Sequence, residues 1–100
     1  MGFVKVLGAS ELVAGQGTTV TVGGRDYALF NVKGDYFCID SECPHRDGPL
    51  GEGELEDDVV MCPWHAWQVN VKTGEVLYAS NYCVATHKTK VEDDSIWIDV

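Results

Sequence analysis

The stretch that decides the fold of this chain is Cys43-Pro44-His45, answered further on by Cys62-Pro63-Trp64-His65. The first has the form C-x-H, the second has the form C-x-x-H, and 16 residues (46–61) separate them. Each stretch offers one thiolate and one imidazole, and these are ligands that zinc and iron–sulfur clusters select. Proline follows each cysteine and pushes it toward extended geometry. The two motifs together predict a metal centre with two sulfur and two nitrogen donors.

The composition is that of one globular domain of 100 residues, of which 45% are hydrophobic. Acidic residues outnumber basic residues 16 to 7, and the formal net charge is −9. This charge argues against binding to nucleic acid or to an anionic membrane surface, because both need clustered Lys and Arg. The N-terminus has no basic start and the chain has no long apolar run, so we expect a cytoplasmic protein without a membrane span. In that compartment, cysteines in histidine-containing motifs favour metal binding over disulfides.

The rest of the chain is patterned for an antiparallel β-structure. Residues 18–22 are β-branched at every position, and Gly23-Gly24 after them predicts a hairpin turn. Prolines and glycines crowd residues 40–53 and predict a loop. No segment shows a helical period. The strands that the sequence predicts are 3–7, 18–22, 27–32, 36–39, 59–61, 68–71, 75–77, 84–91 and 96–100.

The motifs with their flanks, Cys43-Pro-His-Arg-Asp-Gly-Pro-Leu50 and Cys62-Pro-Trp-His-Ala-Trp67, resemble those of Rieske-type [2Fe–2S] ferredoxins. These are small electron carriers of bacterial ring-hydroxylating oxygenase systems, and the resemblance covers nearly the whole chain. It implies a single all-β domain, residues 1–100: an antiparallel β-sandwich with a cluster-binding subdomain at about residues 41–78. It also implies that Cys43 and Cys62 hold the inner iron of a [2Fe–2S] cluster, and that His45 and His65 hold the outer iron.

The function implied by the resemblance is one-electron transfer, without a catalytic residue or a substrate pocket. The carrier would be a monomer that takes electrons from an NADH-dependent flavoprotein reductase. It would pass them to a terminal oxygenase, with docking near His45 and His65. High-potential members carry an extra cysteine in each loop, where this chain has Gly48 and Trp64. We therefore expect a potential near the low end of the Rieske range, about −150 mV. The segment 78–82 departs from the family pattern, since it lacks the proline that many members have there.

Two other functions use the same residues. A Rieske-like small subunit of an assimilatory nitrite reductase would be a fixed part of a larger complex. A structural zinc module with two Cys and two His ligands would use the same four side chains at a tetrahedral metal.

Other residues with possible chemistry have simpler interpretations. Cys38 and Cys83 lie among aromatic and aliphatic neighbours, which favours a role as small buried hydrophobes. His87 lies near Lys88 and Lys90, which favours a surface histidine over a further ligand. The acidic run within residues 52–58 either docks a basic partner or forms a solvated hairpin.

Overall fold

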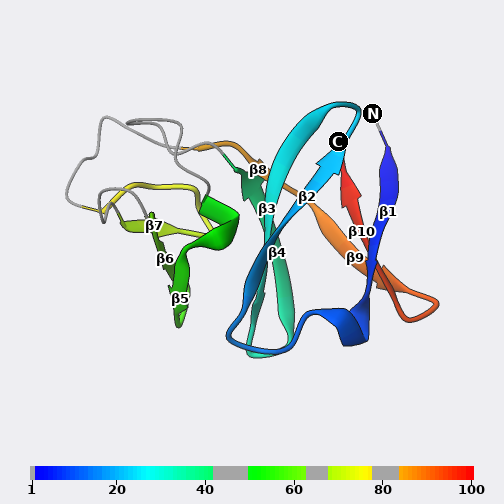
Figure 1. Ribbon diagram of the computed structural model, residues 1–100, viewed down its shortest axis with the longest axis horizontal. Coiled ribbons are helices and arrows are strands. Elements are labelled where there is room, and N and C mark those ends of the chain that lie inside the picture. Colours follow the sequence, from blue (N-terminus) through cyan, green and yellow to red (C-terminus); the bar gives the residue numbers. More distant parts are fainter. Residues whose placement is uncertain (1, 42–49, 63–67, 78–83) are drawn as a thin grey trace.

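The computed structural model describes residues 2–41, 50–62, 68–77 and 84–100, and in these the regular structure is antiparallel β-sheet with two short 3₁₀ turns (Figure 1). The all-β class expected from the sequence is confirmed. The strands belong to three sheets, and the four-stranded sheet lies between the other two. In spatial order, this central sheet consists of β2 (Gly17–Val22), β3 (Arg25–Val32), β4 (Asp35–Asp40) and β8 (Thr86–His87).

Tight turns set the register of the central sheet. Gly23 and Gly24 have φ angles of 61° and 80°, as the two central residues of a type I′ hairpin turn require. Lys33 and Gly34 have φ angles of 54° and 95° and join β3 to β4 in the same manner. Glycine adopts this left-handed region without steric cost, so the turn expected at Gly23-Gly24 is formed.

The second sheet covers one face of the central sheet and joins the two ends of the chain (Figure 1). Its order is β1 (Phe3–Gly8), β10 (Ser95–Asp99) and β9 (Thr89–Glu92). The buried residues between the two sheets form the first core group, which consists of Leu12, Val20, Tyr27, Leu29, Cys38, Ile96 and Ile98. These two sheets make the sandwich.

The third sheet is smaller and packs on the opposite face of the central sheet. It consists of β5 (Glu54–Glu56), β6 (Val59–Met61) and β7 (Gln68–Asn70). Successive side chains of a strand point to opposite faces, so Leu29 of β3 enters the first core group and Phe30 enters the second. The second core group is Ala28, Phe30, Val32, Ile39, Leu50, Val60, Cys62, Val69, Val71, Val76 and Val84.

The structure differs from the sequence-based prediction in its short elements. Residues 75–77 form no strand, and only an isolated bridge joins Val76 to Val69. The predicted strand 84–91 is divided into β8 and β9. The 3₁₀ turns η1 (Ala9–Glu11) and η2 (Leu50–Glu52) were not predicted. Within the part of the chain that the structure describes, no helix is long and apolar enough to cross a membrane.

Candidate metal centre

Of the four predicted ligands, Cys62 lies within the described residues, whereas Cys43, His45 and His65 lie outside them. Cys62 directly follows β6 and is 1% exposed. Its side chain enters the second core group together with Val60, which lies two positions earlier on the same face of the strand. Met61, between them, faces outward and is 37% exposed. Because the thiol is free, it is available as a metal ligand.

Strand pairing holds the two ends of the second motif loop together. The loop leaves the third sheet after Met61 and returns to it at Gln68, and these two residues are direct partners across β6 and β7. The third sheet therefore fixes both ends of the second motif loop, and its strand β6 ends directly before Cys62.

The first motif loop also begins and ends at fixed points. The Leu50 N–H donates to the Ser41 carbonyl at 2.8 Å, and both residues are buried. Gly51 then lies so close to β2 that an added Cβ would be 2.9 Å from the Thr18 carbonyl oxygen and from the Thr19 nitrogen. The segment 42–49, which contains Cys43 and His45, thus starts from the central sheet and ends against it.

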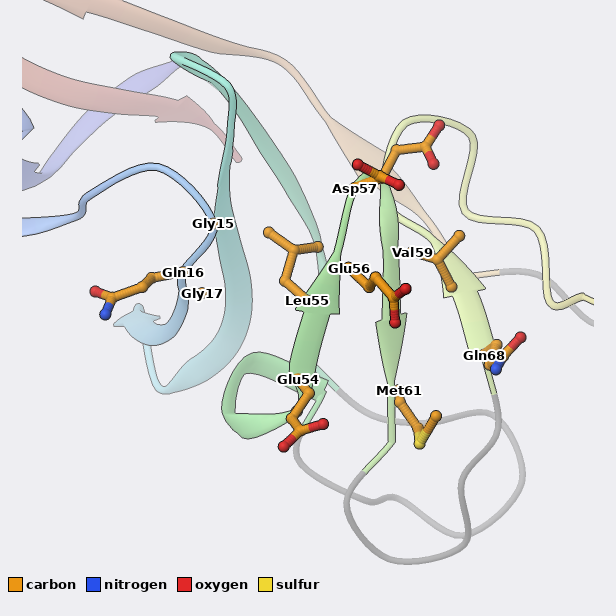
Figure 2. A pocket seen from close by; sticks show the side chains of 12 residues that line it. Gly15, Gln16, Gly17, Glu54, Leu55, Glu56, Asp57, Val59, Met61 and Gln68 are labelled. Carbon is orange, nitrogen blue, oxygen red and sulfur yellow. The ribbon is translucent and has the colours of Figure 1, made fainter.

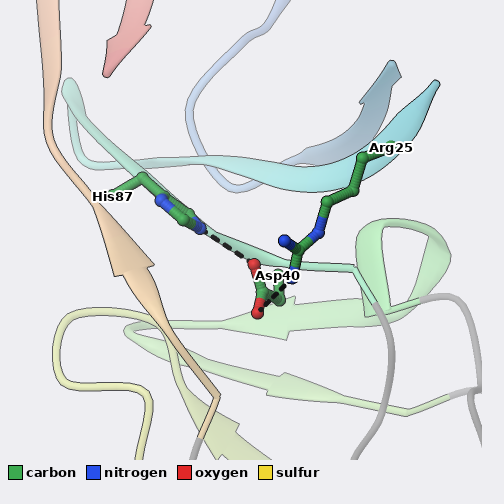
Figure 3. Close-up of polar contacts among 3 residues, drawn as sticks. All are labelled: Arg25, Asp40 and His87. Carbon is green, nitrogen blue, oxygen red and sulfur yellow. Dashed lines mark hydrogen bonds and ion pairs between the residues drawn. The ribbon is translucent and has the colours of Figure 1, made fainter. Parts of the chain in front are cut away.

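Next to the point where the first motif loop begins lies a group of polar side chains that no local sequence pattern indicates, formed by Arg25, Asp40 and His87 (Figure 3). The His87 ring nitrogen Nε2 is 2.8 Å from Asp40 Oδ1, and the Arg25 guanidinium donates to Asp40 Oδ2 at 3.3 Å. The Tyr27 ring meets the His87 ring edge to face at 5.0 Å between centroids. The prediction of a surface histidine was wrong, because the His87 side chain is 19% exposed and paired. We call Arg25, Asp40 and His87 the Asp40 triad.

The acidic run forms a hairpin of β5 and β6 that borders an open groove of about 830 Å³ (Figure 2). Gly15, Gln16 and Gly17 line its other side. The groove is lined by the carboxylate-bearing residues Glu54, Glu56, Asp57 and Asp58. The Asp57 carboxylate is 4.0 Å from the Lys33 ammonium group, and both side chains are strongly exposed. The hairpin of the sequence-based interpretation is present, and its possible docking role stays a prediction.

The donor chemistry fits an iron–sulfur cluster with mixed ligands. Two cysteines and two histidines in paired motifs match the ligand types of a Rieske centre, and Cys62 is a buried free thiol directly after β6. Among the described residues, no group of three or more His, Cys, Asp or Glu side chains is arranged to hold a metal ion. The buried Cys38 lies in the first core group, as expected for a packing residue.

Comparisons with known proteins agree with this chemistry. The Rieske [2Fe-2S] domain family matches residues 2–88. The ferredoxin component of biphenyl 2,3-dioxygenase from Rhodococcus jostii is 33% identical over 102 residues, which cover 100% of this chain and 94% of that protein. A human Rieske domain-containing protein is 39% identical over 66 residues, which are 62% of this chain and 42% of that protein.

A solved structure described as a complex of reduced oxygenase and oxidized ferredoxin in carbazole 1,9a-dioxygenase contains a similar chain. It has a TM-score of 0.88 and 26% identity, and the match covers 96% of this chain and 91% of that chain. The family match spans most of the sequence, and the Rhodococcus relative matches from end to end. The chain therefore belongs to the Rieske [2Fe–2S] family, binds a [2Fe–2S] cluster and is an electron carrier rather than a catalytic enzyme.

Proposed function

We propose that Cys43 and Cys62 hold the inner iron of the cluster and that His45 and His65 hold the outer iron. The spacing of the two motifs supports this assignment, as does the burial of Cys62 at the end of β6. A buried thiolate suits the iron nearer the protein, whereas imidazoles beyond it suit the side that a partner reaches. The cluster supplies one-electron chemistry when bound. The two loops hold it, and the central sheet and the third sheet fix their ends.

We further propose that the carrier delivers single electrons to a terminal oxygenase and receives them from an NADH-dependent flavoprotein reductase. The observation that carries this proposal is the end-to-end match to a relative named as a ferredoxin component of a dioxygenase. The oxygenase is also supported by the similar chain in a complex of oxygenase and ferredoxin. Docking near His45 and His65 would place the outer iron close to either partner.

The same proposal includes the organisation of the chain. Residues 41–78 would be a cluster-binding subdomain within a single domain, 1–100. This division is supported by the third sheet, which packs on one face of the sandwich and contains both strands that flank the second motif. The carrier would act as a cytoplasmic monomer.

The first experiment is cluster assembly on the purified chain, followed by iron and sulfide analysis and a redox titration. We expect two irons and two sulfides per chain, a rhombic electron paramagnetic resonance spectrum after reduction, and a midpoint potential of about −150 mV. A colourless protein that holds one zinc ion would support the structural zinc module instead. A clearly positive midpoint would contradict the low-potential assignment.

The second experiment separates the mobile carrier from the nitrite reductase subunit. Reduced protein is mixed with an oxygenase and its reductase in a stopped-flow instrument, and the absorbance of the cluster is followed. A carrier is reoxidised by the oxygenase and reduced again by the reductase over many cycles. Stable co-purification with an assimilatory nitrite reductase, without turnover in the oxygenase assay, would favour the subunit.

A further inference from the structure

The Asp40 triad lies where the chain passes between the sandwich and the proposed metal centre. Asp40 is the last residue of β4, from which the chain runs to Cys43. His87 lies on β8, the strand that returns to the same sheet edge, and Cys38 and His87 are direct partners there. The Asp40 N–H also donates to the Ala85 carbonyl at 3.0 Å. The triad thus holds together the strands by which the chain leaves and re-enters the sandwich.

The carboxylate of Asp40 is partly shielded from water. Its side chain is 21% exposed and that of His87 is 19% exposed, whereas the Arg25 side chain is 66% exposed. Charges at such sites interact through an effective dielectric constant of about 20, well below that of water. The Arg25 guanidinium, at 3.3 Å, offsets part of the negative charge from the solvent side. A change at either residue therefore changes the field that acts on neighbouring groups.

The Cys38 thiol shows the effect of the Asp40 charge on a neighbouring group. The pKa of the Cys38 thiol is raised to about 12, first because the thiol is buried and second because the Asp40 carboxylate opposes its ionisation. Cys38 lies two residues before Asp40, on the same strand. The negative charge of Asp40 thus penalises the appearance of another negative charge nearby in the protein.

The proposed ligand Cys43 follows Asp40 by three residues. Three residues of fully extended chain span at most about 11 Å. A cluster held by the Cys43 thiolate would therefore be within reach of the Asp40 charge, since protein interior screens charges less than water does. Reduction adds one electron, and so one negative charge, to the centre. A carboxylate nearby opposes that step and a guanidinium nearby favours it.

We propose that the Asp40 triad sets the reduction potential of the cluster, with Asp40 lowering it and Arg25 raising it. The inference rests on the proposed assignment of Cys43 as a ligand. One electron enters from an external reductant, no bond is made or broken, and the triad acts only through its charges. Asp40 and Arg25 would thus tune the cluster by their charges and are not among its proposed ligands.

The test measures the midpoint potential of assembled protein by titration with dithionite at low ionic strength. Asp40→Asn removes a negative charge and is expected to shift the potential upward. Arg25→Gln removes the charge that offsets Asp40 and is expected to shift the potential downward. Arg25 is mostly exposed, so its variant keeps the test decisive even where Asp40→Asn fails to assemble.

The matched controls come from the ion pair of Lys90 and Glu92, whose charged atoms are 3.2 Å apart on β9. This strand belongs to the second sheet, which packs on the face of the central sheet opposite to the third sheet. Glu92→Gln and Lys90→Gln change the net charge by the same amounts as the two test variants. We expect their potentials to stay close to that of the wild type.

An upward shift for Asp40→Asn and a downward shift for Arg25→Gln, each larger than that of its control, support the inference, and shifts of the reverse signs overturn it. Shifts in the same direction, which a loosened loop would give, overturn it, as do shifts no larger than those of the controls. Visible and paramagnetic resonance spectra identify the centre in each variant. A wild-type protein that assembles no iron–sulfur centre contradicts the proposed function itself and is distinguishable from a failure of the tuning role.

Discussion

At the scale of single residues, the Cys38 thiol couples folding to pH. Its pKa is raised from 9.0 to about 12 in the folded protein, by burial and then by Asp40. Between these values the unfolded chain loses the proton and the folded chain keeps it. Stability should therefore fall as pH rises above 9, with a contribution of at most about 1.4 kcal/mol per pH unit from this thiol.

The measurement is urea unfolding of the wild type and of Cys38→Ala between pH 8 and pH 10.5. Other groups titrate in this range in both proteins, so the difference between the two slopes isolates Cys38. We expect the variant to be less stable at pH 8, because it leaves a cavity, but to lose less stability as the pH rises. Equal slopes would show that the thiol ionises as easily in the folded protein as in the unfolded chain.

Gly51 is the residue at which the first motif loop touches β2. A Cβ there would lie 2.9 Å from the backbone of Thr18 and of Thr19, which cannot move without disturbing the strand. We expect Gly51→Ala to lower the free energy of unfolding by about 1–3 kcal/mol, as overpacking does. The control is Gly2→Ala, because an added Cβ at Gly2 meets no atom within 4 Å. Chemical denaturation of both variants checks the prediction, and equal stability would contradict it.

The sequence was informative about ligands and less informative about their surroundings. The C-x-H and C-x-x-H spacing alone identifies four candidate ligands, because thiolate and imidazole in this pattern have few other uses. The burial of Cys38 also followed from its apolar neighbours. His87 was misjudged because its partner, Asp40, lies 47 positions earlier in the chain. No local pattern reveals a contact that two distant strands create.

At the scale of elements, Asn31 near the end of β3 ties three segments together. Its side-chain amide donates to the Leu12 carbonyl at 2.8 Å, and its side-chain oxygen accepts from the Gly34 N–H at 2.8 Å. The side chain is buried within the protein, and the residue as a whole is 5% exposed. Asn31→Ala would leave the Leu12 carbonyl without this partner and should lower stability by about 1–3 kcal/mol.

Asn70 supplies the comparison for this variant. Its side-chain oxygen accepts from the backbone N–H groups of Lys72 and Thr73 in an exposed turn. Water can replace the oxygen there, so Asn70→Ala should cost less than Asn31→Ala in thermal or urea unfolding. A larger loss of stability for Asn70→Ala would mean that the side-chain hydrogen bonds of Asn31 to Leu12 and Gly34 do not stabilise these loops.

Most strands were predicted within two residues of their bounds, including the short β6 and β7, whereas β5 was missed and β8 was merged with β9. Residues 18–22 of β2 are all β-branched and are followed by Gly-Gly, and the predicted strand 18–22 misses only Gly17. By contrast, β8 has two residues, too few for an alternating pattern, and β5 is Glu54-Leu55-Glu56, whose glutamates do not favour a strand. Their pairing depends on neighbours brought by the rest of the fold.

At the scale of the whole molecule, the central sheet carries two separate cores on its two faces. The first core group joins it to the sheet formed by the chain ends, and the second joins it to the sheet beside the proposed centre. The sequence patterns predicted the strands and the hairpin at Gly23-Gly24, and the family resemblance implied the sandwich, but neither predicted the pairing of β1 with β10. The contact of β1 with β10 joins the two ends of the chain and has no local signal.

The two cores predict how the protein responds to removal of the cluster. In the proposed assignment the cluster joins two loops, and its loss restores their conformational freedom. The second core group contains Leu50 and Cys62, each next to a motif loop, and should loosen first. The first core group contains neither of these residues and should keep the sandwich folded.

Hydrogen–deuterium exchange of protein with and without the cluster, read by mass spectrometry, checks this prediction. Removal should speed exchange in β5, β6 and β7 and leave β1, β10 and the centre of β3 protected, because local openings follow cooperative units of the structure. The control is Phe30→Ala in protein that keeps its cluster, because this variant removes packing from the second core group. It should speed exchange in the same three strands. Uniform loss of protection on cluster removal would instead show that the two cores unfold as one unit.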